Sequence, residues 1–142
     1  MGEHVSVAPL TYYVIESRSA SQLGDLLKAR PVQDRFLLIS LSITNGSGKD
    51  VSVPLLEVEN PNGQSFKESE NGEGVSNWMG VLRTVSSNQT IQGQILFDVP
   101  LSSYRLRLPD GGEPGTEKYA WVQIPLRVDT DSSVQAPVPG KQ

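Results

Sequence analysis

The chain has 142 residues, of which 37% are hydrophobic and 20% charged, values typical of one soluble globular domain. It contains no cysteine, which excludes disulfide bonds, thiolate metal sites and a cysteine nucleophile. Because it also has only one histidine, His4, we expect no metal and no cofactor. The formal net charge of −4 argues against nucleic acid or an anionic membrane as a partner, and no apolar run approaches the roughly 18–20 residues that insertion into a membrane needs.

The N-terminal part predicts an edge strand, and we expect no signal peptide in it. Met1–Val5 lacks the charged segment and the apolar stretch of a signal peptide. Val5–Pro9 and Tyr12–Glu16 are the two halves of one expected strand, interrupted near its proline as an edge strand allows. Ser21–Arg30 has leucines at helical spacing and ends before a proline, so we expect a short turn of helix or a structured loop there.

Arg35–Thr44 has the pattern of a half-buried strand. Leucine and isoleucine alternate with serine and threonine along it, which is the period of a strand with one buried face. Phe36 and Leu38 make its first half apolar on both faces. We therefore expect a loop or a neighbouring element to cover the second face there.

The middle of the chain gives weaker signals. Val51–Val58 changes its inward parity beside Pro54, which predicts a β-bulge. Asn60–Gly63 carries proline and glycine at turn positions and predicts a hairpin that returns into Gln64–Lys67. Trp78–Val85 is apolar on both parities, and we place a further strand there.

Three alternating segments complete the set of expected strands: Ile91–Val99, Tyr104–Leu108 and Tyr119–Val128. Within the first of them, Gly93 faces inward among large residues. A glycine inside a strand marks a bulge or a close approach of another backbone, so we expect a packing role for it.

This succession of short strands predicts an all-β protein, an immunoglobulin-like sandwich of two antiparallel sheets with about seven or eight strands. Residues 1–128 are expected to form a single domain. Residues 129–142, rich in proline and small residues, are expected to form a flexible tail. The core predicted between the sheets contains Leu37, Ile39, Leu41, Ile43, Ile95, Phe97, Leu106, Val122 and Ile124.

Three segments resemble a family of bacterial immunoglobulin-like domains of unknown function, also described as telokin-like. Ile43–Gly46 matches a strand that ends in Thr-Asn and a small polar turn, Asn62-Gly63 matches a later Asn-Gly turn, and Gln89–Pro100 matches a Gly-x-x-x-Phe-x-Val strand. Ser87-Asn88 stands where the family usually has Pro-Gly. The matches lie within residues 35–108, about half of the chain.

The family is similar in fold to a secreted mycobacterial immunoprotective antigen, and its members are typically secreted proteins or membrane-tethered lipoproteins. The resemblance therefore implies an extracytoplasmic location (secreted, periplasmic or membrane-tethered). It implies no known enzymatic activity.

Two acidic groups are candidates for chemistry. Glu57 and Glu59 would share one face of a strand, either as a hydrolytic pair or as part of the solvated outer face of a sheet. Glu68, Glu70 and Glu73 form either a calcium loop or an exposed acidic loop, and their spacing misses the calcium-binding pattern. We favour the solvated face and the exposed loop, and we assign no catalytic and no metal-binding residue.

The candidate binding residues are Arg105, Arg107, Tyr119 and Trp121. The two arginines share the outward parity of one strand and the two aromatic residues share that of the next, so a hairpin would place all four on one face. Such a set is either cross-strand cation–π packing or a recognition surface, because Trp, Tyr and Arg dominate binding hot spots.

Two classes of function remain. The preferred hypothesis is a non-enzymatic, extracytoplasmic binding domain whose partner is another cell-envelope protein. The alternative is a carbohydrate-binding module in which Tyr119 and Trp121 stack on the rings of a glycan. A hydrolase ranks last because the carboxylates are dispersed. We expect a monomer or a weak dimer.

Overall fold

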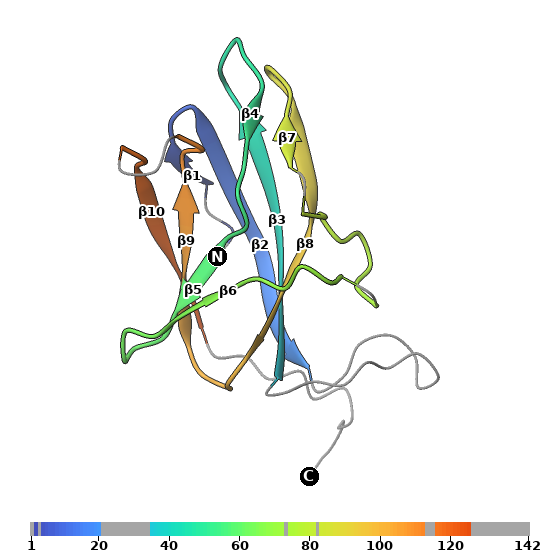
Figure 1. The fold of residues 1–142 in the computed structure, drawn as a ribbon, viewed down its shortest axis with the longest axis vertical. Coiled ribbons are helices and arrows are strands. Elements are labelled where there is room, and N and C mark those ends of the chain that lie inside the picture. The colour runs from blue at the N-terminus through green and yellow to red at the C-terminus, as the bar shows by residue number, and fades with distance from the viewer. Residues whose placement is uncertain are drawn as a thin grey trace.

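Most of the regular structure consists of strands in which apolar and polar residues alternate. Because successive side chains point to opposite faces of a strand, this alternation places the apolar face of each strand against a core. The computed structural model describes residues 2, 4–20, 35–72, 74–81, 83–112 and 116–125, and these residues form ten strands and no helix (Figure 1). The strands are β1 (His4–Val7), β2 (Leu10–Ala20), β3 (Arg35–Asn45), β4 (Val51–Ser52), β5 (Glu57–Glu59), β6 (Ser65–Lys67), β7 (Thr84–Val85), β8 (Thr90–Val99), β9 (Tyr104–Pro109) and β10 (Tyr119–Ile124).

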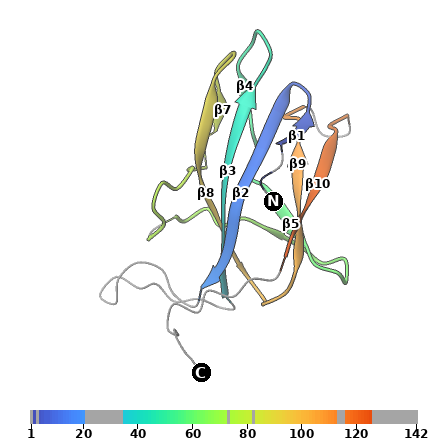
Figure 2. The same cartoon turned by 180° about the vertical axis from the view of Figure 1, so that it is seen from behind.

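Two four-stranded antiparallel sheets face each other across the core, and Figure 2 shows the same two layers from behind. The first sheet has the order β1-β2-β3-β8 and the second has the order β10-β9-β5-β6, while β4 and β7 form a separate two-stranded ribbon. This architecture confirms the predicted all-β sandwich. It has more strands than the seven or eight expected, because the N-terminal segment is a hairpin and the expected strand Val51–Val58 is divided into β4 and β5.

The core lies between the sheets and takes its residues from the inward positions of both. Eight of the nine predicted core residues are buried there, and the ninth, Val122, is partly buried because it lies on the edge strand β10. The prediction of the core from alternation is therefore confirmed.

The N-terminal segment is a hairpin, so the prediction of one broken strand is wrong. Val7 of β1 pairs with Leu10 of β2 across a two-residue turn at Ala8-Pro9, whose peptide bond is cis. The proline that was expected to interrupt one strand instead turns the chain, and β1 lies beside β2 at the edge of the first sheet.

The predicted β-bulge beside Pro54 is also wrong. The chain leaves the ribbon after Ser52 and enters the second sheet at Glu57, so that residues 53–56 cross from one layer to the other. Val53 and Leu56 are both buried along this crossing. The change of inward parity arises from a change of layer and not from an extra residue in a strand.

Most of the strand expected at Trp78–Val85 is a loop. Only its last two residues form β7, while Trp78 makes a single parallel bridge to Gln94 of β8. Both the odd and the even positions of this segment are apolar because successive side chains pack against different parts of the protein. Met79 packs against the core, and the Trp78 ring lies directly over Gly72.

The loop of residues 69–79 accounts for two sequence expectations. A Cβ on Gly93 would lie 2.6 Å from the carbonyl oxygen of Asn77, which confirms the close backbone approach. The loop also covers the second apolar face of β3, as expected, through Val75. That second cluster contains Phe36, Leu38 and Leu96.

Asn45 organises the turn that follows β3. Its buried side-chain amide donates to the carbonyl oxygens of Lys49 and Val85 at 2.6 and 2.9 Å, and its oxygen accepts from the Ser47 N–H at 2.9 Å. Before β8, Asn88 has φ 61°, a left-handed conformation that asparagine tolerates and glycine adopts freely. Asn88 thus makes the turn for which glycine is the usual residue.

Three expectations lie outside the described residues. They are the helical turn at Ser21–Arg30, the end of the last strand at residues 126–128, and the flexible tail at residues 129–142. Of the last predicted strand, the structure describes β10 and Pro125.

Replacing Phe97 by alanine is expected to lower the free energy of unfolding by about 3–5 kcal/mol, because the ring is fully buried and its removal leaves a cavity. Urea denaturation followed by far-UV circular dichroism measures the change. Leu101→Ala is the matched control, since Leu101 is 48% exposed and should lose about 0.5 kcal/mol or less. Equal losses in the two variants would contradict the burial of Phe97.

Tyr12 connects the two sheets. Its hydroxyl, on β2, donates to the carbonyl oxygen of Pro109, on β9, at 2.5 Å. Burial raises the pKa of the Tyr12 phenol well above its ordinary value, and the carboxylates of Glu117 and Asp110 raise this pKa further. The folded protein therefore keeps the phenol protonated at a pH where the unfolded chain ionises it.

Above about pH 10, where an unfolded tyrosine ionises, the wild-type protein is expected to lose stability because the unfolded state releases this proton first. Tyr12→Phe should be less stable than wild type by about 1 kcal/mol at neutral pH, because the hydrogen bond is lost. Urea denaturation of both proteins at neutral pH and near pH 10.5 tests this. The difference in the free energy of unfolding between wild type and Tyr12→Phe should be smaller at the higher pH. An equal difference at both pH values would contradict the link between Tyr12 ionisation and stability.

Candidate functional site

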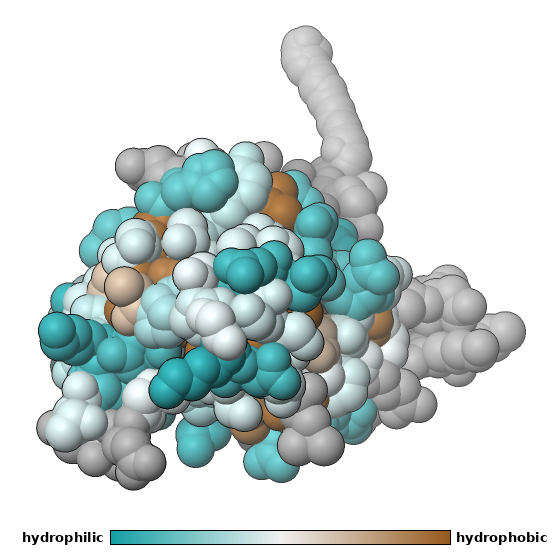
Figure 3. All heavy atoms as spheres, turned by 90° about the horizontal axis from the view of Figure 1, so that it is seen from above, coloured by the Kyte–Doolittle hydropathy of each residue, from teal (hydrophilic) through white to brown (hydrophobic). Residues whose placement is uncertain are grey.

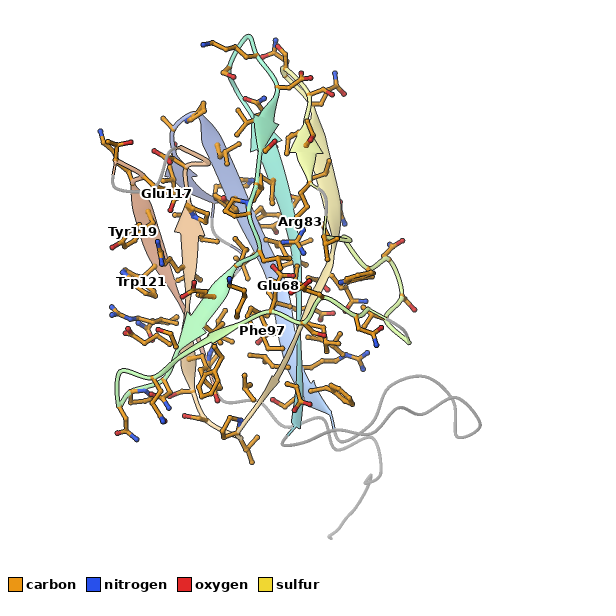
Figure 4. All side chains as sticks on the ribbon, in the orientation of Figure 1. Glu68, Arg83, Phe97, Glu117, Tyr119 and Trp121 are labelled. Carbon is orange, nitrogen blue, oxygen red and sulfur yellow. The ribbon has the colours of Figure 1, made fainter. Side chains whose placement is uncertain are left out.

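The hairpin of β9 and β10 brings the four candidate binding residues onto one face, which we call the aromatic–arginine patch (Arg105, Arg107, Tyr119 and Trp121). The guanidinium carbon of Arg105 lies 3.8 Å from the centroid of the Trp121 ring, and that of Arg107 lies 4.2 Å from the centroid of the Tyr119 ring. The two rings meet edge to face with centroids 6.0 Å apart. Figure 4 shows both rings along β10, at the outer edge of the second sheet.

The carboxylates of β5 are partners of the patch arginines. Register places Glu59 beside Arg105 and Glu57 beside Arg107. Both the Nε and the Nη2 of Arg105 donate to Glu59 Oε1, at 2.8 and 2.5 Å. The expectation of a solvated outer sheet face holds in part, because these carboxylates are half-buried and engaged in ion pairs.

The two arginines are held differently. Among the described residues the ion pairs of Arg107 are long, 3.4 Å from Nη2 to Glu117 Oε1 and 3.9 Å from Nη1 to Glu57 Oε1. Arg105 makes two short hydrogen bonds to one oxygen. A guanidinium has five N–H donors, so Arg107 retains the capacity to donate to a ligand, whereas Arg105 is fixed more firmly in place.

A groove of about 940 Å³ adjoins the Arg107 end of the patch, and its size falls within the usual range of ligand sites. It is lined by the crossing segment 53–56, by Val81 and by Glu117, Arg107 and Tyr119. Val81 and Tyr119 are 39% and 49% exposed, so they bring accessible apolar surface to the groove. The face of the molecule seen from above is mainly hydrophilic, with scattered apolar residues (Figure 3).

A buried ion pair lies next to the groove, and it corrects the expectation of an exposed acidic loop. Glu68 is 3% exposed, and its two carboxylate oxygens accept from Arg83 Nη1 and Nη2 at 2.6 and 2.5 Å. Glu68 also accepts from the Leu56 N–H at 2.7 Å, while Arg83 Nε donates to the Gly80 carbonyl at 2.9 Å. Figure 4 shows the Glu68 and Arg83 side chains pointing toward each other. Of the other two glutamates of the expected acidic loop, Glu70 is exposed and Glu73 lies outside the described residues.

Sequence reasoning missed two residues of this site, Glu117 and Arg83. Glu117 lies in a loop whose path the pattern does not fix. Glu57 was named as a candidate, but its contact with Arg107 depends on the pairing of β5 with β9. Arg83 did give a signal: an arginine inside the apolar stretch Trp78–Val85 indicates a buried charge that needs a partner.

The described residues include no group of three or more histidine, aspartate or glutamate side chains placed to hold a metal ion. Within the same residues there is no helix with the length and apolar character needed to cross a membrane. The site itself contains hydrogen-bond donors, carboxylate acceptors and aromatic surface.

The chain belongs to the family described as "Domain of unknown function (DUF4352)", whose model matches residues 1–118. No curated protein matches the sequence. The family match confirms the resemblance found in the sequence and extends it to most of the chain.

Solved structures with the same fold come from several bacteria. The yjhA protein from Bacillus subtilis has a TM-score of 0.67 and 14% identity, over 87% of this chain and 97% of that one. MPT63, a secreted protein from Mycobacterium tuberculosis, has a TM-score of 0.53 and 15% identity, over 89% and 92%. A "putative lipoprotein (ycdA)" from Bacillus subtilis has a TM-score of 0.59 and 9% identity, over 84% of this chain but only 38% of that one. The TM-scores show a shared β-sandwich fold, and at these low identities the likeness shows the fold alone.

Arg83→Met is expected to lower the free energy of unfolding by about 3–5 kcal/mol, because it leaves the Glu68 carboxylate buried without its cation. The double variant Glu68→Met/Arg83→Met should lose less than this single variant, since no unpaired charge remains. Urea denaturation of both variants measures the difference. Arg105→Met is the control, because this arginine is 40% exposed and its ion pair contributes about 1 kcal/mol or less. A double variant less stable than Arg83→Met would contradict the explanation.

Proposed function

We propose that this chain is a non-enzymatic recognition domain that acts outside the cytoplasm, and that it binds another cell-envelope protein through the aromatic–arginine patch and the adjoining groove. The observation that carries the proposal is the stacking of Arg105 on Trp121 and of Arg107 on Tyr119, each arginine also facing a carboxylate. Such contacts hold large side chains in fixed positions before a partner arrives, which lowers the entropic cost of binding.

The composition of the site supports a protein partner. Tyrosine, tryptophan and arginine are the residues that contribute most to protein–protein hot spots. Val81 and Leu55 bring aliphatic surface to the groove, next to donors on Arg107 and acceptors on Glu117. A partner side chain with an apolar part and a polar end could contact both the aliphatic surface and the hydrogen-bonding groups of the groove.

The extracytoplasmic location is supported by the kind of protein that shares the fold. The solved structures of similar fold include a secreted protein and a protein described as a lipoprotein. Secretion or membrane tethering would expose the patch to other components of the cell envelope.

Glycan binding, the alternative function, has less support from the geometry. A sugar ring stacks on an open aromatic face, but the Arg105 guanidinium covers one face of Trp121. The Tyr119 and Trp121 rings are inclined at 86°, so they do not form a flat platform. The exposed Tyr119 ring remains the contact that a glycan would use, and the experiment below includes this case.

The double substitution Tyr119→Ser/Trp121→Ser is expected to abolish binding to envelope proteins of the source cell, because it removes both rings of the patch. Binding is measured by quantitative pull-down with purified chain, against envelope proteins in one arm and purified cell-wall polysaccharide in the other. The melting temperature should fall only modestly, since both residues lie on an edge strand, with Tyr119 exposed and Trp121 half-buried.

Ile15→Ser is the matched control, because Ile15 is an exposed apolar residue on β2, in the other sheet. It should retain full binding. Retention of binding by the double variant would refute the patch as the site, and binding confined to the polysaccharide arm would favour the glycan alternative.

A further inference from the structure

The outer edge of β10 carries backbone groups that point away from its only neighbouring strand. The Asp110 N–H donates to the Lys118 carbonyl at 2.9 Å, so these two residues form a hydrogen-bonded pair at the end of the β9–β10 ladder. Such pairs alternate with non-hydrogen-bonded pairs along an antiparallel ladder. It follows that Tyr119, Trp121 and Gln123 direct their N–H and C=O groups away from β9.

The opposite residue supports this assignment. Pro109, which has no N–H, lies opposite Tyr119, in a pair that the alternation makes non-hydrogen-bonded. β10 is the last strand of its sheet, and in the part of the chain that the structure describes no backbone hydrogen bond reaches its outer side.

The protein treats another sheet edge differently. The outer side of β8 is covered by the loop of residues 69–79, through hydrogen bonds of Ser69 N–H to the Leu96 carbonyl at 2.7 Å and of Met79 N–H to the Gln94 carbonyl at 2.9 Å. Covering an edge in this way is a common protection against pairing with another chain. Among the described residues no backbone hydrogen bond covers the outer side of β10 in this way, although β1 of the first sheet lies close to β10.

The sequence of β10 itself carries few of the usual protections. Its six residues, Tyr-Ala-Trp-Val-Gln-Ile, include no charge and no proline, and most of them favour strands, although Lys118 and Pro125 lie directly at its two ends. The inward residues Ala120 and Val122 pack against the core but remain only partly buried. A strand added at this edge would bury them further, provided that its own inward residues were small or apolar.

We infer that a second copy of this chain occupies the edge, with β10 pairing antiparallel to β10 and the two second sheets joining into one. A two-fold axis at Trp121 places this residue opposite Trp121 of the second copy and Tyr119 opposite Gln123. In this register all three outward-directed residues meet their counterparts, and each can exchange hydrogen bonds.

Charge and pattern favour a second copy over an unrelated strand. β10 itself has the alternation that the edge requires, and self-pairing brings no like charges together because the strand has none. The nearest charges are those of Arg105 and Arg107, which already face Glu59, Glu57 and Glu117. The inference is independent of the proposed function, although the dimer would place two patches side by side on one continuous face.

Gln123→Pro tests the inference, because proline removes the Gln123 N–H from the open edge while costing no bond to β9. Gln123→Thr is the matched control, since it changes the same side chain and keeps the N–H. Sedimentation velocity of wild type and both variants, from about 1 µM to about 1 mM, covers the range of a weak dimer.

Wild type and Gln123→Thr are expected to dimerise with rising concentration, with Gln123→Pro at least tenfold weaker. A wild-type protein that stays monomeric, or equal association of Gln123→Pro, would overturn the inference. Because Gln123→Pro retains all four patch side chains, its pull-down of envelope proteins should persist, and this separates failure of the dimer from failure of the proposed function.

Amide hydrogen exchange by NMR provides a second measurement, which stands even where Gln123→Pro is poorly folded. In wild type the amides of Tyr119, Trp121 and Gln123 should gain protection as concentration rises, while those of Ala120 and Val122 should be protected throughout. Outward amides that exchange equally fast at low and high concentration would overturn the inference.

Discussion

The buried ion pair of Glu68 and Arg83 is the interaction on which the passage of the chain between the two sheets depends. It fixes the crossing segment 53–56 from both ends, since Glu68 binds the Leu56 N–H and the Arg83 carbonyl accepts from the Val53 N–H. Two charges removed from water are tolerated only where their hydrogen-bonding groups are satisfied, and here the carboxylate and the guanidinium both have several partners. The crossing segment also lines the groove, together with Arg107 and Pro109 of β9.

Strand β9 links the core to the candidate site. Its residues Leu106 and Leu108 are fully buried between the sheets, while Arg105 and Arg107 project from the outer face. Since side chains alternate strictly along a strand, the packing that fixes the leucines also fixes the direction of the arginines. The neighbours of β9 then supply the partners, with aromatic rings from β10 on one side and carboxylates from β5 on the other.

The two arginines show how similar residues can differ in use. Arg105, held at short distance by Glu59 and stacked on Trp121, is suited to positioning the ring. Arg107, with its longer contacts, borders the groove and keeps donors for a ligand. Recognition would therefore depend on Arg107 and Tyr119 for contact and on Arg105 for the rigidity of the patch.

The sequence by itself determined the strands with strict alternation, the face that each buries, the core and the close approach at Gly93, because these follow from the period of a strand. It also placed the patch on one face, since β9 and β10 are successive strands of a hairpin. Tertiary structure alone decided that Glu59 meets Arg105, 46 residues away, and that Glu68 is buried with Arg83. These pairs join strands and loops that are distant in the chain, and alternation gives the direction of a side chain but not the identity of the neighbouring segment.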